Sequence, residues 1–237
     1  MNRQMLSLIP CRAKIGWVCL LALLCCKVQV ATAQTDSLLV TKNFKFKDGL
    51  YLSLESFQRN KPDLDWGEVR AQVFSNPQTF LTQVASIEVK DTNIHRPLSI
   101  TALWGISLDG IPYIQLPPAS TDSDLPTFAG LRVRGKLCYF EYEKTERKDV
   151  LIQAYNPLNG RPFRQGYVER DVLVAYAKIL NFGTGEIVSF AQDKLLEQIE
   201  DDSKLHNTVA QLSEEEVAEK LFKCLLIYDD RHPVFIR

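Results

Sequence analysis

The sequence predicts an α+β fold, in which an antiparallel sheet built as a meander of hairpins is covered by two C-terminal helices. The stretch Ser99–Leu116 places two apolar, β-prone runs around Asp109-Gly110, a dipeptide that favours a tight type I′ turn. Further alternating segments continue up to Phe190. After Ser189 the apolar period becomes helical, and strands followed by helices are typical of an α+β domain.

Residues 1–33 are predicted to be a signal peptide. A basic region ending at Lys14 precedes an apolar run over Ile15–Cys26, which is too short to span a bilayer comfortably. A small-x-small cleavage site at Ala31–Ala33 then precedes Gln34. Residues 34–47 are expected to form a leader with a short strand near its end, and residues 48–237 a single α+β domain.

Two alternatives for this N-terminus stay open. It could be a buried or anchoring helix, or it could carry lipid on Cys25 or Cys26. A lipidation site requires a small residue before the modified cysteine, and Leu24 is large. Membrane association is therefore expected only through a lipid anchor.

Removing the signal peptide changes both the charge and the cysteine content. Four basic residues and no acidic ones are lost, so the net charge falls from −1 to −5. A mildly acidic chain without a basic cluster is a poor nucleic-acid binder, which excludes that class of partner. Only Cys138 and Cys224 remain, and an oxidising compartment would permit a disulfide between them. The sequence slightly favours two buried thiols.

The first elements of the domain follow from local signals. Asp48-Gly49 is a turn signal, and Ser53 is placed to cap a short helix over Leu54–Asn60. Pro62 discourages continuation of that helix through Lys61.

This opening string resembles that of a family of uncharacterised secreted proteins from Bacteroidota. The hairpin from Trp104 to Ile114 and the tail from Gly185 to Pro233 are also similar to that family. The resemblance implies an exported, single-domain protein, and it implies no chemistry because the family has no assigned activity. The matching positions in the opening string are Gly49, Tyr51, Ser53, Glu55, Phe57, Asn60 and Pro62.

Strands and turns dominate the middle of the chain. A strand is expected over Gln83–Lys90, while His95 and Pro117–Leu125 are expected in exposed loops. Pro112 cannot donate to a ladder, so its strand is expected at a sheet edge. The later segments are predicted strands at Leu137–Glu143, Asp149–Tyr155, Val172–Phe182 and Glu186–Phe190, with turns at Lys144–Lys148 and Asn156–Pro162.

Two helices are predicted after these strands. Ser189 and Gln192 fit a capping box for the first helix, whose apolar stripe follows. Ser213 and Glu216 fit the same motif at the start of the last helix, which Pro233 ends.

No catalytic, cofactor-binding or metal-binding residue is assigned from the sequence, because no nucleotide-binding loop, nucleophile elbow or zinc motif is present. Acidic pairs near His206 and His232 are the only plausible metal ligands that lie close together in the sequence. Asp201 and Asp202 are expected to serve as helix-end and cap residues, and Asp229 and Asp230 to form a solvated terminus. No metal or other cofactor is therefore predicted.

The remaining candidate thiols, carboxylates and aromatic residues are explained by structural roles. Cys224 lies on an apolar helix stripe and Cys138 in a strand, so both are expected to be inert. Glu55, Glu141 and Glu143 are carboxylates that a hydrolase would need to bring to a cleft, and a solvated sheet face is the expected alternative. Five aromatics that could stack on glycans or peptides are expected mostly in the core: Trp66, Trp104, Tyr113, Tyr139 and Tyr142.

The sequence predicts an exported protein that is periplasmic, extracellular or associated with the outer membrane. We expect a non-catalytic binding or envelope-assembly role, with an envelope protein or a glycan as partner. A hydrolase with a carboxylate- or His-based site, involving Glu55, Glu141 or His206, is one alternative, and a lipid-anchored surface protein is another. The sequence does not indicate the oligomeric state.

Overall fold

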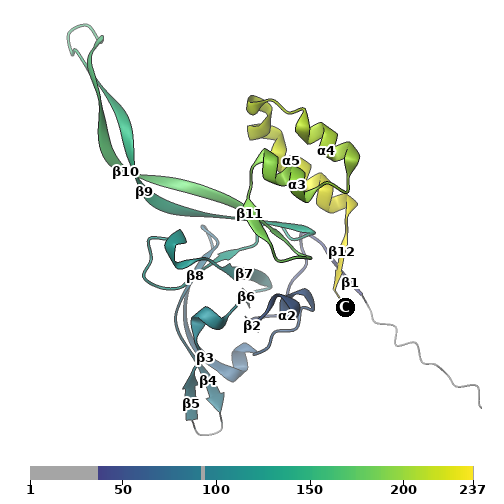
Figure 1. The fold of residues 1–237 in the computed structure, drawn as a ribbon. Helices are drawn as coiled ribbons and strands as arrows, with labels where there is room; N and C mark the ends of the chain where they lie inside the picture. The colour runs from purple at the N-terminus through teal and green to yellow at the C-terminus, as the bar shows by residue number, and fades with distance from the viewer. Residues whose placement is uncertain (1–36, 92–93, 237) are drawn as a thin grey trace, which may run out of the picture. The chain divides into compact units, whose positions relative to one another are not determined.

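The computed structural model describes residues 37–91 and 94–236 (Figure 1). The predicted signal peptide, its cleavage site and the cysteines considered for lipidation lie outside the described residues. Antiparallel sheet dominates the described part, and three α-helices follow near its C-terminal end. The predicted α+β class is confirmed in this coarse form.

The largest sheet has seven antiparallel strands in the order β2-β6-β7-β8-β4-β3, with β5 paired to β4. Strands β6 to β8 form a meander, but the sheet as a whole does not, because the β3–β4 hairpin lies beside β8 and β2 beside β6. The sequence missed β3 and placed His95 in a loop, whereas it lies in β5. The bounds are β2 Gly49–Tyr51, β3 Val69–Asn76, β4 Leu81–Asp91, β5 Ile94–Pro97, β6 Gly105–Leu108, β7 Ile111–Gln115 and β8 Thr127–Gly130.

The β6–β7 hairpin forms around the predicted turn but lies in the middle of the sheet. Asp109 and Gly110 both have positive φ, 55° and 79°, as the type I′ turn requires. Since β2 pairs with β6 and β8 with β7, the predicted edge position of Pro112 is wrong. The β7–β8 register begins at Tyr113, and the Pro112 carbonyl accepts the Leu131 N–H at 2.9 Å. The missing proline N–H therefore falls just outside that ladder.

A second sheet consists of β9 (Leu137–Tyr155), β10 (Pro162–Asn181) and the short β11 (Ile187–Ser189). The turn predicted at Lys144–Lys148 is wrong, because β9 runs through it without interruption. These charged residues are tolerated in a strand because they lie opposite β10 with solvent around them, as in the exposed ion pair of Arg147 with Asp171. The turn predicted at Asn156–Pro162 is confirmed.

Three helices, not two, follow the strands: α3 (Gln192–Gln198), α4 (Ser203–Ala210) and α5 (Glu214–Arg231). The capping box predicted at Ser189 is wrong, since Ser189 belongs to β11 and Ala191 is the N-cap of α3. The Gln192 side chain instead donates to the carbonyls of Val209 and Leu212, at 2.7 and 3.2 Å, which ties α3 to the end of α4.

The remaining caps agree with the sequence. Asp202 caps α4 through the Leu205 N–H, and Ser213 with Glu216 forms the capping box of α5. Ser53 caps the short helix α2 (Leu54–Gln58). The 3-10 helices are η1 Trp66–Glu68, η2 Ile100–Ala102 and η3 Pro118–Ser120.

The segment predicted as a leader contributes to the packed structure at its C-terminal end. Strand β1 (Leu38–Val40) pairs with β12 (Val234–Ile236), and Phe46 is buried in a stacked contact with Phe57, 4.7 Å between ring centres. A separate apolar cluster joins α3, α4 and α5 to the base of the β9–β10 hairpin through Leu137, Tyr139 and Ile179. Within the described residues, no helix combines the length and apolarity needed to cross a bilayer.

Candidate functional site

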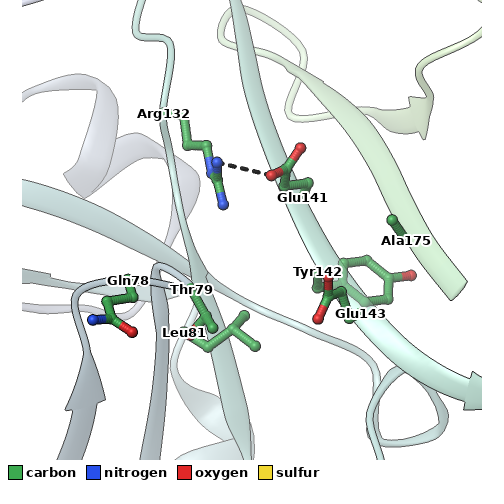
Figure 2. Close-up of a pocket in the computed structure, with 8 residues that line it drawn as sticks. All are labelled: Gln78, Thr79, Leu81, Arg132, Glu141, Tyr142, Glu143 and Ala175. Carbon is green, nitrogen blue, oxygen red and sulfur yellow. Dashed lines mark ion pairs between the residues drawn. The ribbon is translucent and has the colours of Figure 1, made fainter. Parts of the chain in front are cut away.

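Glu141 lies in a shallow depression of about 160 Å³ between β9 and the β3–β4 turn (Figure 2). Arg132 Nη1 is 2.8 Å from Glu141 Oε1, and the Tyr139 hydroxyl donates to Oε2, also at 2.8 Å. The Arg132 guanidinium lies over the ring of Phe80, 5.1 Å from its centre. Both oxygens of Glu141 are therefore occupied by protein donors. Glu143, two residues further along β9, is more exposed than Glu141.

The electrostatics of this depression favour a fixed ion pair. Burial, together with the bond to Glu141, raises the pKa of Tyr139 to about 12. Tyr139 therefore stays protonated near neutral pH and continues to donate to the Glu141 carboxylate. The bonds from Arg132 and Tyr139 to Glu141 orient the Arg132 guanidinium, which lines the depression.

The other residues weighed for hydrolysis or nucleophilic attack are dispersed. Glu55 lies on α2 and pairs with Arg59 at 2.6 Å, while His206 lies on α4. In the described part of the chain, no hydrogen bond or ion pair joins Glu55, Glu141 and His206 to one another. Cys138 and Cys224 are separate buried thiols, as the sequence favoured, and burial raises the pKa of Cys138 to about 12.

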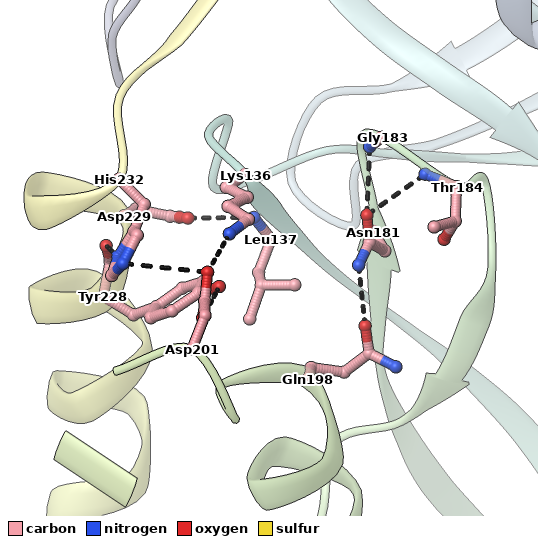
Figure 3. Close-up of polar contacts among 10 residues, drawn as sticks. All are labelled: Lys136, Leu137, Asn181, Gly183, Thr184, Gln198, Asp201, Tyr228, Asp229 and His232. Carbon is pink, nitrogen blue, oxygen red and sulfur yellow. Dashed lines mark hydrogen bonds and ion pairs between the residues drawn. The ribbon is translucent and has the colours of Figure 1, made fainter. Parts of the chain in front are cut away.

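A polar cluster connects α5 to the start of β9 and the loop before α4 (Figure 3). Asp201 receives a 2.5 Å ion pair from Lys136 Nζ and a 2.7 Å hydrogen bond from the Tyr228 hydroxyl. His232 stacks on Tyr228 at 4.2 Å, with its Nε2 3.8 Å from Asp201 Oδ2. Burial opposes ionisation of Asp201, but the bonds from Lys136 and Tyr228 outweigh it and lower its pKa. The cluster therefore holds α5, the start of β9 and the loop before α4 together.

The predicted solvated position of Asp229 is wrong. Its Oδ1 accepts the Leu137 N–H at 2.8 Å, and its buried Oδ2 has no hydrogen-bond partner among the described residues. Burial raises the pKa of Asp229 to about 7. Gly135 lies against this carboxyl group so closely that an added Cβ would come within 2.4 Å of its carbon. Asp230, by contrast, is exposed as predicted. The part of the chain that the structure describes holds no group of three His, Cys, Asp or Glu side chains placed to share a metal ion.

The aromatic residues weighed as ligand platforms belong to the packed structure. Tyr113, Tyr139 and Tyr142 are buried, as expected for core residues. Trp66 and Trp104 are half-buried against apolar clusters, and Trp66 Nε1 donates to the Ser107 carbonyl at 2.8 Å. No aromatic platform forms from these five residues.

Several exposed apolar side chains lie on the far end of the β9–β10 hairpin, residues 150–168, which we call the hairpin tip. Figure 1 shows where the two strands of this hairpin end. Leu158 at the turn is 94% exposed, and Phe163 and Tyr167 are 69% and 72% exposed. The sequence missed this surface because residues 163–171 were not assigned to a strand. Tyr167 lies directly opposite Leu151, a contact that no local pattern in the sequence indicates.

Apolar side chains occupy both faces of the hairpin tip. Leu151 lies opposite Tyr167, and the adjacent pair, Val150 and Val168, points to the other face because successive strand residues alternate. Near the base, the Asp122 carboxylate accepts the outward Thr145 N–H at 2.8 Å. Among the described residues, nothing outside the tip is hydrogen-bonded to it. The tip is a two-stranded ribbon with two free edges.

Comparison with known proteins adds no assignment: no family model, curated protein or solved structure matches the chain. The resemblance to a secreted Bacteroidota family stays a prediction. The function must therefore be argued from the geometry described above.

Proposed function

We propose that this chain is an exported, non-catalytic interaction protein whose binding surface is the hairpin tip. The observation that carries the proposal is the exposure of Leu158, Phe163 and Tyr167 on a ribbon that no other described element covers. Soluble monomers rarely keep such apolar surface exposed unless it meets a partner. Tyr, Phe and Arg, which the tip supplies, are also enriched in interface cores.

Export and an envelope partner are supported by the sequence features of residues 1–33. The basic start, the apolar run and the small-x-small site together are typical of a cleaved signal peptide. The partner would then be a component of the cell envelope, either a protein, a glycan or a lipid. A lipid-anchored form stays an alternative proposal.

The hydrolase alternative receives less support. A general acid or base needs access to the proton it transfers. Glu141 instead has both oxygens bound by Arg132 and Tyr139, and Glu55 and His206 lie on other elements. The depression beside Glu141 is also shallow, whereas ligand sites are usually enclosing clefts.

The test compares two variants of the same protein in envelope extract. One carries a photo-crosslinking side chain at Leu158, and the matched control carries it at Lys204, an exposed residue of α4. We expect a defined crosslinked species from position 158 and none from position 204. Equal labelling from both positions, or none from either, contradicts the proposal.

A shortened hairpin provides the second arm of this test. Joining Val150 to Val168 through Asn-Gly keeps a paired position and supplies a turn sequence that fits a two-residue hairpin. We expect this variant to keep the unfolding midpoint of the wild type and to lose retention on envelope material. Unchanged retention would show that the tip is not the binding surface.

A further inference from the structure

The turn at the end of the hairpin tip satisfies its own backbone donors. Between Asn156 and Pro162, every residue that has a backbone N–H donates it to another group of the same turn, and the two prolines have no N–H. The acceptors are the Arg161 carbonyl for Asn156, Asn156 Oδ1 for Leu158, the Asn156 carbonyl for Asn159 and Gly160, and Asn159 Oδ1 for Arg161, at distances from 2.8 to 3.3 Å.

This internal satisfaction matters because the turn is otherwise fully open to solvent. In water an exposed N–H needs no protein partner, whereas in an apolar medium an unpaired one costs several kcal/mol, of order 2–7 by transfer measurements. A turn that has already paired its donors can leave water without that penalty. Leu158, its most exposed side chain, would then gain free energy from burial.

The charge of the hairpin tip differs from that of the molecule around it. No Asp or Glu occurs between Val150 and Val168, while Arg161 lies in the turn and Arg164 follows it on β10. The chain without residues 1–33 is net acidic, so the tip is a local positive end on a negative protein. Guanidinium groups are well suited to pair with phosphate oxygens.

The aromatic residues form the third part of the pattern. Phe163 and Tyr167 follow Leu158 along β10, and Tyr155 precedes it on β9, with its hydroxyl donating to Gln153 at 2.8 Å. Tyrosines are enriched at the level of lipid headgroups, where one end of the ring is apolar and the other is wet. Beyond the aliphatic apex at Leu158, arginines and aromatic residues alternate along the chain as Arg161, Phe163, Arg164 and Tyr167.

From these three observations we propose that the hairpin tip docks into the headgroup layer of a bilayer containing anionic lipid. The proposal rests on the proposed function, because it names the partner of the same surface. Leu158 and Phe163 enter the outer part of the acyl region, and Arg161 and Arg164 pair with lipid phosphates. A second copy of the chain and a protein pocket are the competing occupants, and the experiment separates them.

The experiment measures co-sedimentation of the chain from Gln34 onward with vesicles. Omitting the predicted signal peptide matters because its apolar run would bind lipid by itself. One set of vesicles contains equal parts of phosphatidylglycerol and phosphatidylcholine, and the other contains phosphatidylcholine alone. We expect binding to the anionic vesicles that weakens with added salt, and much weaker binding to the neutral ones.

Two double variants locate the contact. L158D/F163D should bind the anionic vesicles at least about tenfold more weakly. The reason is that carboxylates replace two apolar side chains that the bilayer would otherwise bury. R161A/R164A should lose most of the preference for anionic over neutral vesicles. The matched control is Phe74→Asp, at a comparably exposed phenylalanine of β3, and it should bind like the wild type. Circular dichroism should show each variant folded, since these side chains are exposed.

The outcomes distinguish failure of the lipid assignment from failure of the proposed function. Vesicle binding that L158D/F163D leaves unchanged overturns the lipid assignment. So does a dimer in sedimentation velocity that this variant abolishes, because the tip then meets a second copy. If no vesicle binds while position 158 still crosslinks to one envelope protein, the lipid assignment fails and the proposed function stands. If position 158 crosslinks to nothing, both fail.

Discussion

The two halves of the β9–β10 hairpin belong to one ladder, whose register shifts only between Pro162 and Arg164, but they differ in what covers them. In the half near the base, Phe140 is 1% exposed and Leu180 is fully buried. At the tip, Leu158 and Phe163 stand in solvent although they belong to the same hairpin. Backbone pairing therefore sets where the strands run, whereas burial depends on a second layer that only the base possesses. A two-stranded ribbon adds little stability alone, so the apolar residues of the tip are better explained by an outside contact.

Truncating one phenylalanine in each half tests whether the base and the tip differ in their contribution to stability. Phe140→Ala should lower the free energy of unfolding by about 3–5 kcal/mol, because it empties part of a packed core. Phe163→Ala should change it by less than about 0.5 kcal/mol, since the side chain packs on little. Urea unfolding followed by circular dichroism measures both. Similar losses in the two variants would mean that the tip is part of the folded core.

The anchoring of the base to α5 can be tested through pH. The native pKa of Asp229, about 7, lies above its ordinary value of 3.8, so the native state binds the extra proton between these values. The contribution of this group to stability is therefore fully present at low pH and is lost as pH rises toward 7. Asp229→Asn should match the wild type near pH 4 and exceed it by about 4 kcal/mol above pH 7, the free energy that corresponds to the difference between 3.8 and about 7.

A neighbouring carboxylate serves as the control for this pH test. Asp230→Asn removes an exposed group whose charge contributes to the raised pKa of Asp229, so the pH dependence should keep its direction and become only slightly smaller. Asp201 and Asp202 have lowered pKa values and act in the opposite direction, but they are unchanged in both variants. A parallel pH dependence for wild type and Asp229→Asn would show that the Asp229 carboxyl is not held in its buried position.

The boundary between the two halves gives the smallest effect. Asp122→Ala removes the acceptor of the outward Thr145 N–H, so this amide should exchange with solvent several-fold faster, with global stability unchanged. Hydrogen exchange measured by NMR resolves the single amide. An unchanged rate at Thr145 would place the transition from base to tip elsewhere along β9.

Local signals allowed much of this fold to be predicted. The Asp109-Gly110 turn, the Ser213 capping box and the Asn156–Pro162 turn depend on residues adjacent in sequence, and all three are confirmed. The Lys144–Lys148 segment was misjudged as a turn because its charges lack an apolar face. In the structure both faces of this ribbon are largely solvated, so no such face is needed to keep it in a strand.

The site could not be predicted for a related reason. Asp229 is buried by Leu137 and Gly135, which lie more than ninety residues earlier in the chain, and no local pattern encodes that contact. The exposed apolar surface of the hairpin tip was not predicted because its residues come together across two strands. Tyr167 and Leu151 become neighbours only once the register is known.

The pairing of β1 with β12 has a consequence for how the molecule folds. Leu38 lies opposite Ile236, so this ladder closes a loop that contains nearly all of the described chain. Hairpins such as β6–β7 can form from neighbouring residues, but contacts this distant in sequence are slow to form. A chain that emerges N-terminus first from a ribosome must keep β1 unpaired until Val234–Ile236 has emerged. This ladder therefore forms later than the hairpins whose strands are neighbours in sequence.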